Sequence, residues 1–227
     1  MTDAPERRRR QLYGRRKGPK LSAHQQLLRD TLLPRLLLHP ETGRDPRDYF
    51  DEAVDDVWLE VGYGAGEHLL WQAQHHPGVG LIGAEPYVAG TAKLLSKLAA
   101  TPLPNLRLFE DDARDIVDAL PDACLGRFFL LFPDPWQKTR HHKRRFLQTE
   151  MLDRLARVLK PGAELRFASD DAGYVAYALE RLMGHRAFAW TARSQADWKT
   201  RPADWPPTRY EAKELHGPPV FLRFVRL

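Results

Sequence analysis

Short apolar runs alternate with amphipathic segments along most of the chain. The runs are rich in Val, Leu, Ile and Phe and have the length of buried strands. We expect strands over residues 57–62, 79–86, 105–111, 125–132, 163–169, 187–194 and 218–227. We expect helices between them over residues 67–76, 88–100, 113–120, 144–162 and 173–184, the fourth of which is stopped by Pro161 and Gly162.

This alternation of strand and helix predicts βαβ units and a parallel sheet covered by helices on both faces. The last two apolar runs have no helical pattern between them, which indicates an antiparallel edge strand. The expected fold is therefore a doubly wound, Rossmann-like α/β domain with seven mostly parallel strands and an antiparallel edge strand.

One more helix is expected before the first strand, over residues 21–38. Ser22 stands at an N-cap position with Gln25 three residues later, and Pro34 should kink or split the helix. A polar stretch over residues 40–56 is interpreted as a loop. We therefore divide the chain into a basic, flexible arm over residues 1–21 and a single domain over residues 22–227.

Positive charge is concentrated at the start of the chain. Eight basic residues stand against Asp3 and Glu6 within the first twenty: Arg7, Arg8, Arg9, Arg10, Arg15, Arg16, Lys17 and Lys20. The arm therefore carries a formal charge of +6, which leaves −1 for the remainder of a chain of net charge +5. Such an arm indicates a polyanionic partner, although a solvated tail explains the charge equally well.

Composition sets the limits of this interpretation. The 227 residues, 43% of them hydrophobic, can bury one sizeable core. Cys124 is the only cysteine, so no intrachain disulfide can form and we expect a reducing compartment. No apolar run approaches a membrane span or a signal-peptide core, and the arm lacks the Ser-rich pattern of a transit peptide. The expected location is the cytoplasm.

A glycine-rich turn, LEVGYGAGEHLL, follows the first expected strand. Gly62, Gly64 and Gly66 allow a tight turn and a close approach of the backbone to a ligand. Glu85 ends the next strand, where an acid reaches the ribose hydroxyls of an adenosine. The alternative is a simple glycine turn with an unrelated surface glutamate.

The acids around this turn distinguish between cofactors. Glu60 precedes the glycines and Glu67 follows them, and both would repel the pyrophosphate of a dinucleotide. They suit the ammonium and sulfonium groups of S-adenosylmethionine, which is the expected cofactor. Asp112 follows the third strand and would either meet the adenine amino group or cap the next helix.

The fourth strand ends in the sequence FPDPWQKTRHHKRR. Pro133 and Pro135 restrict the backbone on both sides of Asp134, and Trp136 offers a flat surface for stacking a base. The cations that follow would contact phosphates: Lys138, Arg140, His141, His142, Lys143, Arg144 and Arg145. Because cations oppose the dipole at a helix N-terminus, a bound phosphate backbone explains them better than a solvated helix start.

A metal site is not expected. The histidines His75, His76, His141 and His142 stand in adjacent pairs, without a cysteine or an acid at ligand spacing.

With these motifs, the chain resembles the bacterial tRNA (guanine-N7-)-methyltransferase family. The resemblance rests on LEVGYGAGE, LIGAEPYVAG, LLFPDPWQKTRHHKRR, LKPGAELRFASD and TRYE, and it covers the chain from residue 17 to about residue 211. It implies the class I methyltransferase fold and S-adenosyl-L-methionine as the methyl donor. It also implies a tRNA substrate that is methylated at N7 of the variable-loop guanine, position 46.

The resemblance further implies individual roles. The acids Glu60, Glu85, Asp112 and Asp134 match cofactor-contacting positions, and Asp134 is also the expected active-site residue. Substrate-binding positions are matched by Lys138, Asp170, Thr208, Arg209, Tyr210 and Glu211, and the RNA-contacting stretch by residues 140–145. The chain departs from the family pattern at two places that concern the binding of guanine. The aromatic residue usually found after Asp170 is missing, and the segment after His216 and Gly217 lacks a later aspartate.

Two other functions match part of the pattern. Enzymes that methylate the exocyclic amine of adenine also end the fourth strand in an acid or amide, proline and an aromatic. They usually have two successive prolines, whereas here one proline stands on each side of Asp134. A non-catalytic RNA-binding relative would keep the fold, but all the expected cofactor acids are present. Whether the chain is a monomer or a homodimer is left open.

Overall fold

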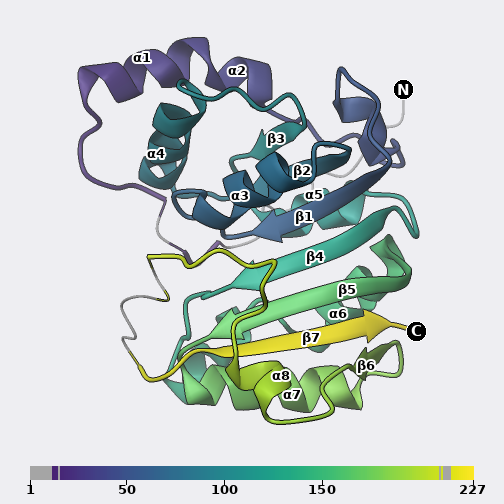
Figure 1. Cartoon of the computed structure of the whole chain (residues 1–227). Helices are drawn as coiled ribbons and strands as arrows, with labels where there is room; N and C mark the ends of the chain where they lie inside the picture. Colours follow the sequence, from purple (N-terminus) through teal and green to yellow (C-terminus); the bar gives the residue numbers. More distant parts are fainter. Residues whose placement is uncertain (1–11, 15, 210, 212–215) are drawn as a thin grey trace, which may run out of the picture.

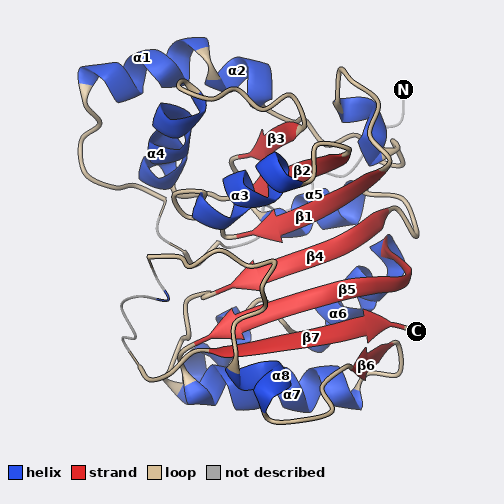
Figure 2. Cartoon of the chain, viewed as in Figure 1, coloured by secondary structure: helices blue, strands red, loops and turns tan. Residues whose placement is uncertain are grey.

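The central element of the computed structural model is one mixed sheet, shown in Figures 1 and 2. The structure describes residues 12–14, 16–209, 211 and 216–227. Within these residues the seven strands are β1 (Asp56–Val61), β2 (Val79–Ala84), β3 (Leu106–Phe109), β4 (Leu125–Leu131), β5 (Leu159–Ser169), β6 (Phe188–Trp190) and β7 (Val220–Arg226). Their order across the sheet is β3-β2-β1-β4-β5-β7-β6.

The strand directions confirm the expected mostly parallel sheet. The pairs β1–β2, β2–β3, β1–β4 and β4–β5 are parallel, whereas β7 is antiparallel to both β5 and β6. The antiparallel strand β7 thus stands next to the edge, and the short strand β6 forms the edge itself. The chain order reverses between β1 and β4, and ligands of open α/β sheets bind at such a switch point.

Helices cover both faces of the sheet. They are α1 (Ala23–Thr31), α2 (Leu33–Leu36), α3 (Glu67–His75), α4 (Val88–Leu98), α5 (Ala113–Ala119), α6 (Thr149–Val158), α7 (Ala172–Gly184) and α8 (Ala196–Lys199), with 3-10 helices η1 (Pro46–Tyr49) and η2 (Thr139–Arg144). Leucines of α1 to α4 pack with Trp58 and Phe129 on one face. The apolar sides of α5, α6 and α7 pack on the other face.

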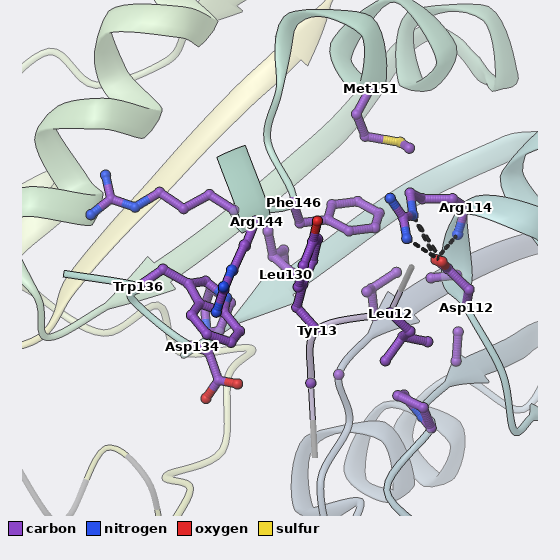
Figure 3. Close-up of a pocket in the computed structure, with 18 of the residues that line it drawn as sticks. Leu12, Tyr13, Asp112, Arg114, Leu130, Asp134, Trp136, Arg144, Phe146 and Met151 are labelled. Atoms are coloured by element: carbon purple, nitrogen blue, oxygen red, sulfur yellow. Dashed lines mark hydrogen bonds and ion pairs between the residues drawn. The ribbon is translucent and has the colours of Figure 1, made fainter. Parts of the chain in front are cut away.

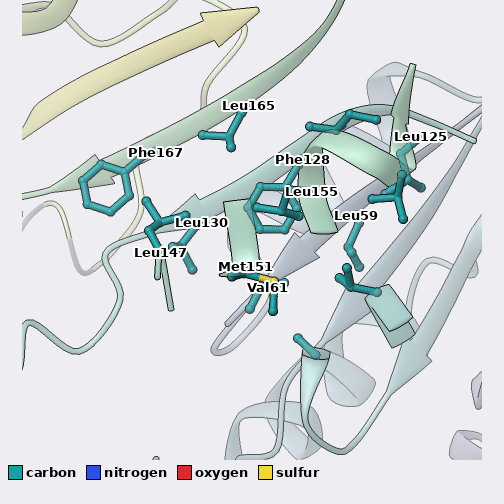
Figure 4. Close-up of a cluster of buried hydrophobic side chains, with 14 of the residues drawn as sticks. Leu59, Val61, Leu125, Phe128, Leu130, Leu147, Met151, Leu155, Leu165 and Phe167 are labelled. Carbon is teal, nitrogen blue, oxygen red and sulfur yellow. The ribbon is translucent and has the colours of Figure 1, made fainter. Parts of the chain in front are cut away.

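The strand β4 shows why the central runs are mostly apolar. Successive side chains of a strand point to opposite faces. Phe128 and Leu130 therefore join α6 residues such as Met151 in one core, shown in Figure 4, while Phe129 belongs to the core on the other face. A strand covered on both sides has no solvent-facing side and is therefore mostly hydrophobic, with Arg127 as the charged exception in β4.

The first helix begins and divides as the sequence predicts. Ser22 accepts a hydrogen bond from the Gln25 backbone, and the Gln25 side chain accepts one from the Ser22 backbone, which completes a capping box. The helix α1 ends at Thr31, and α2 begins at Leu33 with Pro34 in its first turn. The proline therefore splits the helix into two.

Two predictions about helices are wrong. The helix expected over residues 144–162 is only α6, because residues 159–162 already extend into β5 and Leu159 pairs with Leu125. The preceding cations lie in the separate 3-10 helix η2, so the argument from the dipole of an α-helix does not apply to them. A short helix, α8, also lies between the last two strands, where no helix was expected.

The described part of the N-terminal arm lies against the domain. The backbone N–H of Val88, at the start of α4, donates to the carbonyl of Arg16 at 3.1 Å, and the Arg16 guanidinium pairs with Asp111 at 2.9 Å. The rest of the expected flexible arm, residues 1–11 and 15, lies outside the described residues. None of the described helices has the length and apolar composition needed to span a membrane.

Candidate active site

The glycine turn after β1 has the backbone conformation that glycine favours. The φ angles of Gly62, Gly64 and Gly66 are 77°, 56° and 74°, in the left-handed region. A Cβ on Gly66 would stand 2.2 Å from a methyl carbon of Leu94, so this glycine also permits α3 and α4 to pack closely. A Cβ on Gly62 would meet no atom of the described residues within 4 Å, so they leave space for a ligand beside the turn.

A cavity of about 1030 Å³ opens beside this turn, at the carboxyl ends of β1, β2 and β4. Figure 3 shows its lining. The expected site residues that line it are Gly62, Gly64, Glu85, Asp112, Asp134, Lys143, Arg144 and Arg145. The switch point thus brings together the glycine turn, three of the four expected cofactor acids and part of the cation-rich segment.

Glu85 is held rigidly at the cavity wall. Its carboxylate accepts one hydrogen bond from the Gly64 backbone and one from the Tyr87 backbone, each of 2.9 Å. Burial raises the pKa of Glu85 to about 6, and the negative charges of Asp134 and Glu60 add to this effect. The carboxylate is thus oriented at the cavity before any ligand arrives.

Asp112 caps a helix and also stands where a ligand can reach it. Its side chain caps α5 by accepting a hydrogen bond from the Arg114 backbone at 3.0 Å, and it forms an ion pair with the Arg114 guanidinium. The same residue lines the cavity. Capping therefore fixes the carboxylate at the edge of the sheet where ligands bind.

Glu60 does not line the cavity, in contrast to the other expected cofactor acids. Its side chain is buried, and its Oε2 lies 2.7 Å from Nδ1 of His68 in α3. Alternation along β1 directs Glu60 to the face of the sheet that α3 covers. Gly66 is also absent from the lining, because its role is the N-cap of α3 and the close contact with Leu94.

The loop that carries Asp134 is conformationally strained. Phe132 and Trp136 have φ angles of 48° and 46°, which cost non-glycine residues about 1–3 kcal/mol each. The backbone N–H of Phe132 donates to the carbonyl of Ala168 in β5 at 2.7 Å. The two prolines between these residues hold Asp134 at an exposed position on the cavity rim.

One face of Trp136 is occupied within the protein. The Arg144 guanidinium lies 4.9 Å from the Trp136 ring and 4.7 Å from the ring of Tyr13. In Figure 3, Tyr13 stands between this stack and the ion pair at the start of α5. Residues 12–14 all line the cavity. The described start of the chain is therefore part of the site, which was not predicted from the sequence.

The structure does not support a phosphate contact for Arg145. Only 3% of its surface is exposed, and its guanidinium donates to the carbonyls of Pro135 and Gly173 at 2.8 and 3.1 Å. It also lies 4.7 Å from the rings of Tyr174 and Tyr177, and burial lowers its pKa. Arg145 therefore fastens the loop after β4 to α7.

The other cations of the segment are more accessible than Arg145. Those that are exposed are Lys138, Arg140 and Lys143, and His142 is partly exposed. Slight desolvation and the positive charges of neighbouring arginines lower the pKa of His141. A bound phosphate would reverse this effect of charge, because it favours the protonated imidazole.

The expected substrate residues lie in two groups, of which the first surrounds Asp170. This residue accepts a hydrogen bond from the His216 backbone at 3.2 Å, and Gln137 donates to Asp171 at 3.0 Å. The loop after β4, the loop after β5 and the segment before β7 therefore meet. Gln137 was not predicted from the sequence, because it stands beside conspicuous cations and carries no charge.

The second group stands at the start of α3. Arg209 pairs with Glu67 at 3.7 Å, and Thr208 accepts a hydrogen bond from the Glu211 backbone at 3.2 Å. The side chain of Glu211 pairs with Arg201 at 3.6 Å. This segment is therefore held by ion pairs next to the glycine turn. Tyr210, the remaining expected substrate residue, lies outside the described residues.

The remaining candidates for metal or thiol chemistry are the His, Cys, Asp and Glu side chains. Across the described part of the chain, no group of three or more His, Cys, Asp or Glu residues could hold a metal ion. Cys124 does not line the cavity, and burial raises the pKa of its thiol to about 12. The thiol therefore stays protonated at neutral pH.

Comparisons with solved structures define the fold. An rRNA methylase from Streptococcus thermophilus matches with a TM-score of 0.50 at 14% identity, over 89% of this chain and 93% of the other. A 16S rRNA (adenine(1408)-N(1))-methyltransferase from Catenulisporales acidiphilia matches with a TM-score of 0.51 at 15% identity, over 77% and 89%. The fold is that of the class I methyltransferases.

Sequence comparisons define the family. A family model described as a putative methyltransferase matches residues 55–218. A tRNA (guanine-N(7)-)-methyltransferase of Rhodospirillum rubrum is 51% identical over 94% of this chain and 87% of its own length. Proteins of the same name from Brucella abortus and Caulobacter vibrioides are each 48% identical, over 94% of both chains. The chain belongs to the tRNA (guanine-N7-)-methyltransferase family.

Proposed function

We propose that this protein transfers the methyl group of S-adenosyl-L-methionine to N7 of the variable-loop guanine, position 46, of tRNA and forms 7-methylguanosine. The observation that carries the proposal is the position of the Asp134 loop. Its acid stands on the rim of the switch-point cavity, and the exposed cations of η2 follow directly in the chain.

The residues of the cavity fit S-adenosylmethionine, which supplies an electrophilic methyl group on a sulfonium. Glu85 has the position and fixed orientation to accept hydrogen bonds from ribose hydroxyls. Asp112 is available to the adenine amino group, and the open space above Gly62 admits the ligand against the backbone. Glu85 and Asp134, which do line the cavity, place negative charge there that suits a cationic ligand better than a pyrophosphate.

The acceptor atom determines what the protein has to do. N7 of neutral guanine has a free lone pair and no proton, so the reaction needs in-line approach and no general base. Positive charge develops on the purine as the methyl group moves. Asp134 stabilises that charge through its carboxylate, and Asp170 would accept hydrogen bonds from N1 and N2 of guanine, which favours guanine over adenine.

The test of the function is methylation of unmodified tRNA with labelled cofactor, followed by nucleoside analysis. We expect label in 7-methylguanosine, and we expect it to disappear when guanine 46 is replaced. Label in an adenine methylated on its exocyclic amine would support the adenine-directed alternative. Binding of tRNA without any transfer would support the non-catalytic alternative.

The exposed cations lead to a prediction about salt. If η2 and the arm together make about five phosphate contacts, log K for tRNA should fall with log salt at a slope of roughly −3.5 to −4.5. Lys143→Ala should lower the slope by about one contact for any tRNA. The control is Arg186→Ala, because Arg186 is also exposed but lies just before the edge strand β6, away from the cation-rich segment. A wild-type slope near zero would contradict phosphate binding.

A further inference from the structure

The face of the sheet that α3 covers contains a buried charge network. Arg166 of β5 is only 2% exposed, and Arg127 of β4 lies 4.1 Å over the ring of Trp58. Among the described residues, the segment Arg201–Pro207, which we call the strap, reaches both arginines. Its Trp205 is buried in the core of this face.

Asp204 attaches the strap to the sheet. Its carboxylate lies 2.7 Å from the Arg166 guanidinium and 3.7 Å from that of Arg127. Burial opposes ionisation, but the Arg166 hydrogen bond and both positive charges outweigh it, so the pKa of Asp204 is lowered. Glu164 completes the network at 2.7 Å from Arg166.

Gln72 of α3 attaches the strap to the helix that follows the glycine turn. Its side chain has no exposed surface, and its amide donates to the backbone carbonyl of Asp204 at 2.8 Å. The same amide nitrogen lies 3.0 Å from Nε2 of His68. Because this ring nitrogen accepts from the amide, the His68 proton lies on Nδ1 and is donated to Glu60 at 2.7 Å.

A buried chain of hydrogen bonds thus joins Glu60 at the end of β1 to the strap. The strap leads directly into Thr208, and Arg209 returns to Glu67 in the first turn of α3. The substrate segment is therefore fastened to α3 at two points. Burial of the polar groups in the chain makes each hydrogen bond stronger and costly to break.

We propose that Gln72 and Asp204 are positioning residues that hold the substrate segment, namely Thr208, Arg209 and Glu211, in the place where it meets tRNA. This inference rests on the proposed function and on the substrate role that the family resemblance implies for Thr208, Arg209 and Glu211. Neither residue lines the cavity. Each acts through the strap, so losing one should weaken tRNA binding and spare the chemical step.

The decisive variant is Gln72→Met, which keeps the length of the side chain and removes both donated hydrogen bonds. We expect KM for tRNA to rise roughly threefold to tenfold, which lies within the range for the loss of one neutral hydrogen bond. The kcat and the Kd of S-adenosylhomocysteine without tRNA should be unchanged. The control is Gln74→Met, because Gln74 is exposed on the same helix. This substitution should change none of these values.

Asp204→Asn provides an independent second variant, since it removes the charge that pairs with Arg166 and Arg127 at a partly exposed position. It should raise KM for tRNA in the same manner, and the double variant should cost less than the sum of the two, because both act on one strap. An unchanged KM in folded single variants would overturn the inference, as would an equal loss of cofactor affinity. Failure of the wild-type protein to methylate tRNA would instead refute the proposed function.

Discussion

Asp134→Asn is expected to bind cofactor and tRNA yet transfer the methyl group about 10²–10³-fold more slowly, the usual loss for one preorganised electrostatic contact. The substitution keeps the size of the side chain and removes its charge. Two hydrogen bonds that do not involve Asp134 hold the loop: Arg145 donates to the Pro135 carbonyl, and the Phe132 backbone donates to the Ala168 carbonyl. The conformation of the loop should therefore be unchanged in the variant. Single-turnover kinetics with both ligands saturating measures the effect.

The pH dependence separates this role from proton removal. With N7 as the acceptor, the saturated single-turnover rate should be flat from mildly acidic to mildly alkaline pH. Saturation is required because histidine changes its charge within this range, so residues such as His141 would alter tRNA affinity. A general base would give a rate that climbs with pH through its own pKa, and a roughly tenfold climb across neutral pH that Asp134→Asn abolishes would contradict this account. That result would favour the adenine-directed alternative.

Glu85→Ala is expected to weaken binding of S-adenosylhomocysteine by about 1.5–3 kcal/mol, the range for hydrogen bonds to a charged group. The carboxylate is already oriented by the backbones of Gly64 and Tyr87, so little is lost in ordering it. Isothermal titration calorimetry in mildly alkaline buffer measures the change. Unchanged affinity in a folded variant would remove Glu85 from the cofactor site.

The pKa of Glu85, raised to about 6, adds a pH signature to this prediction. Ribose hydroxyls donate to the carboxylate and favour its charged form, so binding should release a proton around that pH. Affinity of the wild-type protein should therefore rise as the pH passes upward through about 6 and then level off. Glu85→Ala should give a flat profile over the same interval. If the affinity of the wild-type protein also did not change with pH, another group would accept the hydrogen bonds of the ribose hydroxyls.

The raised pKa also affects the stability of the free protein. Because the folded-state pKa lies above the ordinary value of 4.5, the contribution of Glu85 to stability is present below that value and is lost as pH rises through about 6. A bound ligand compensates for this loss at neutral pH. The site thus keeps a buried carboxylate that is less favourable without its ligand, as is common where pKa values are perturbed for function.

The grouping of the cavity residues was predictable from the sequence. Gly62, Gly64, Glu85, Asp112 and Asp134 line one cavity, because the alternation of strands and helices already places the carboxyl ends of parallel strands at one edge. That inference needs only local periodicity and the fixed handedness of βαβ connections.

The surroundings of three other residues were not predictable in this way. The run KRR does not distinguish Lys143, which is exposed, from Arg145, whose burial depends on a carbonyl of α7. Glu60 precedes the glycine turn directly, yet its side chain turns to α3 and not to the cavity. Arg145 and Glu60 are buried by contacts with α7 and α3, which are elements of the fold to which they do not belong.

By itself, the sequence determined the strands, most of the helices and the edge of the sheet at which the cavity opens, because periodicity, turn residues and charge are properties of short segments. Only the tertiary structure decided which charged side chains reach the cavity and which fasten loops. Burial and partners depend on contacts between distant segments, such as that of Gln72 with Asp204, and no local pattern records them.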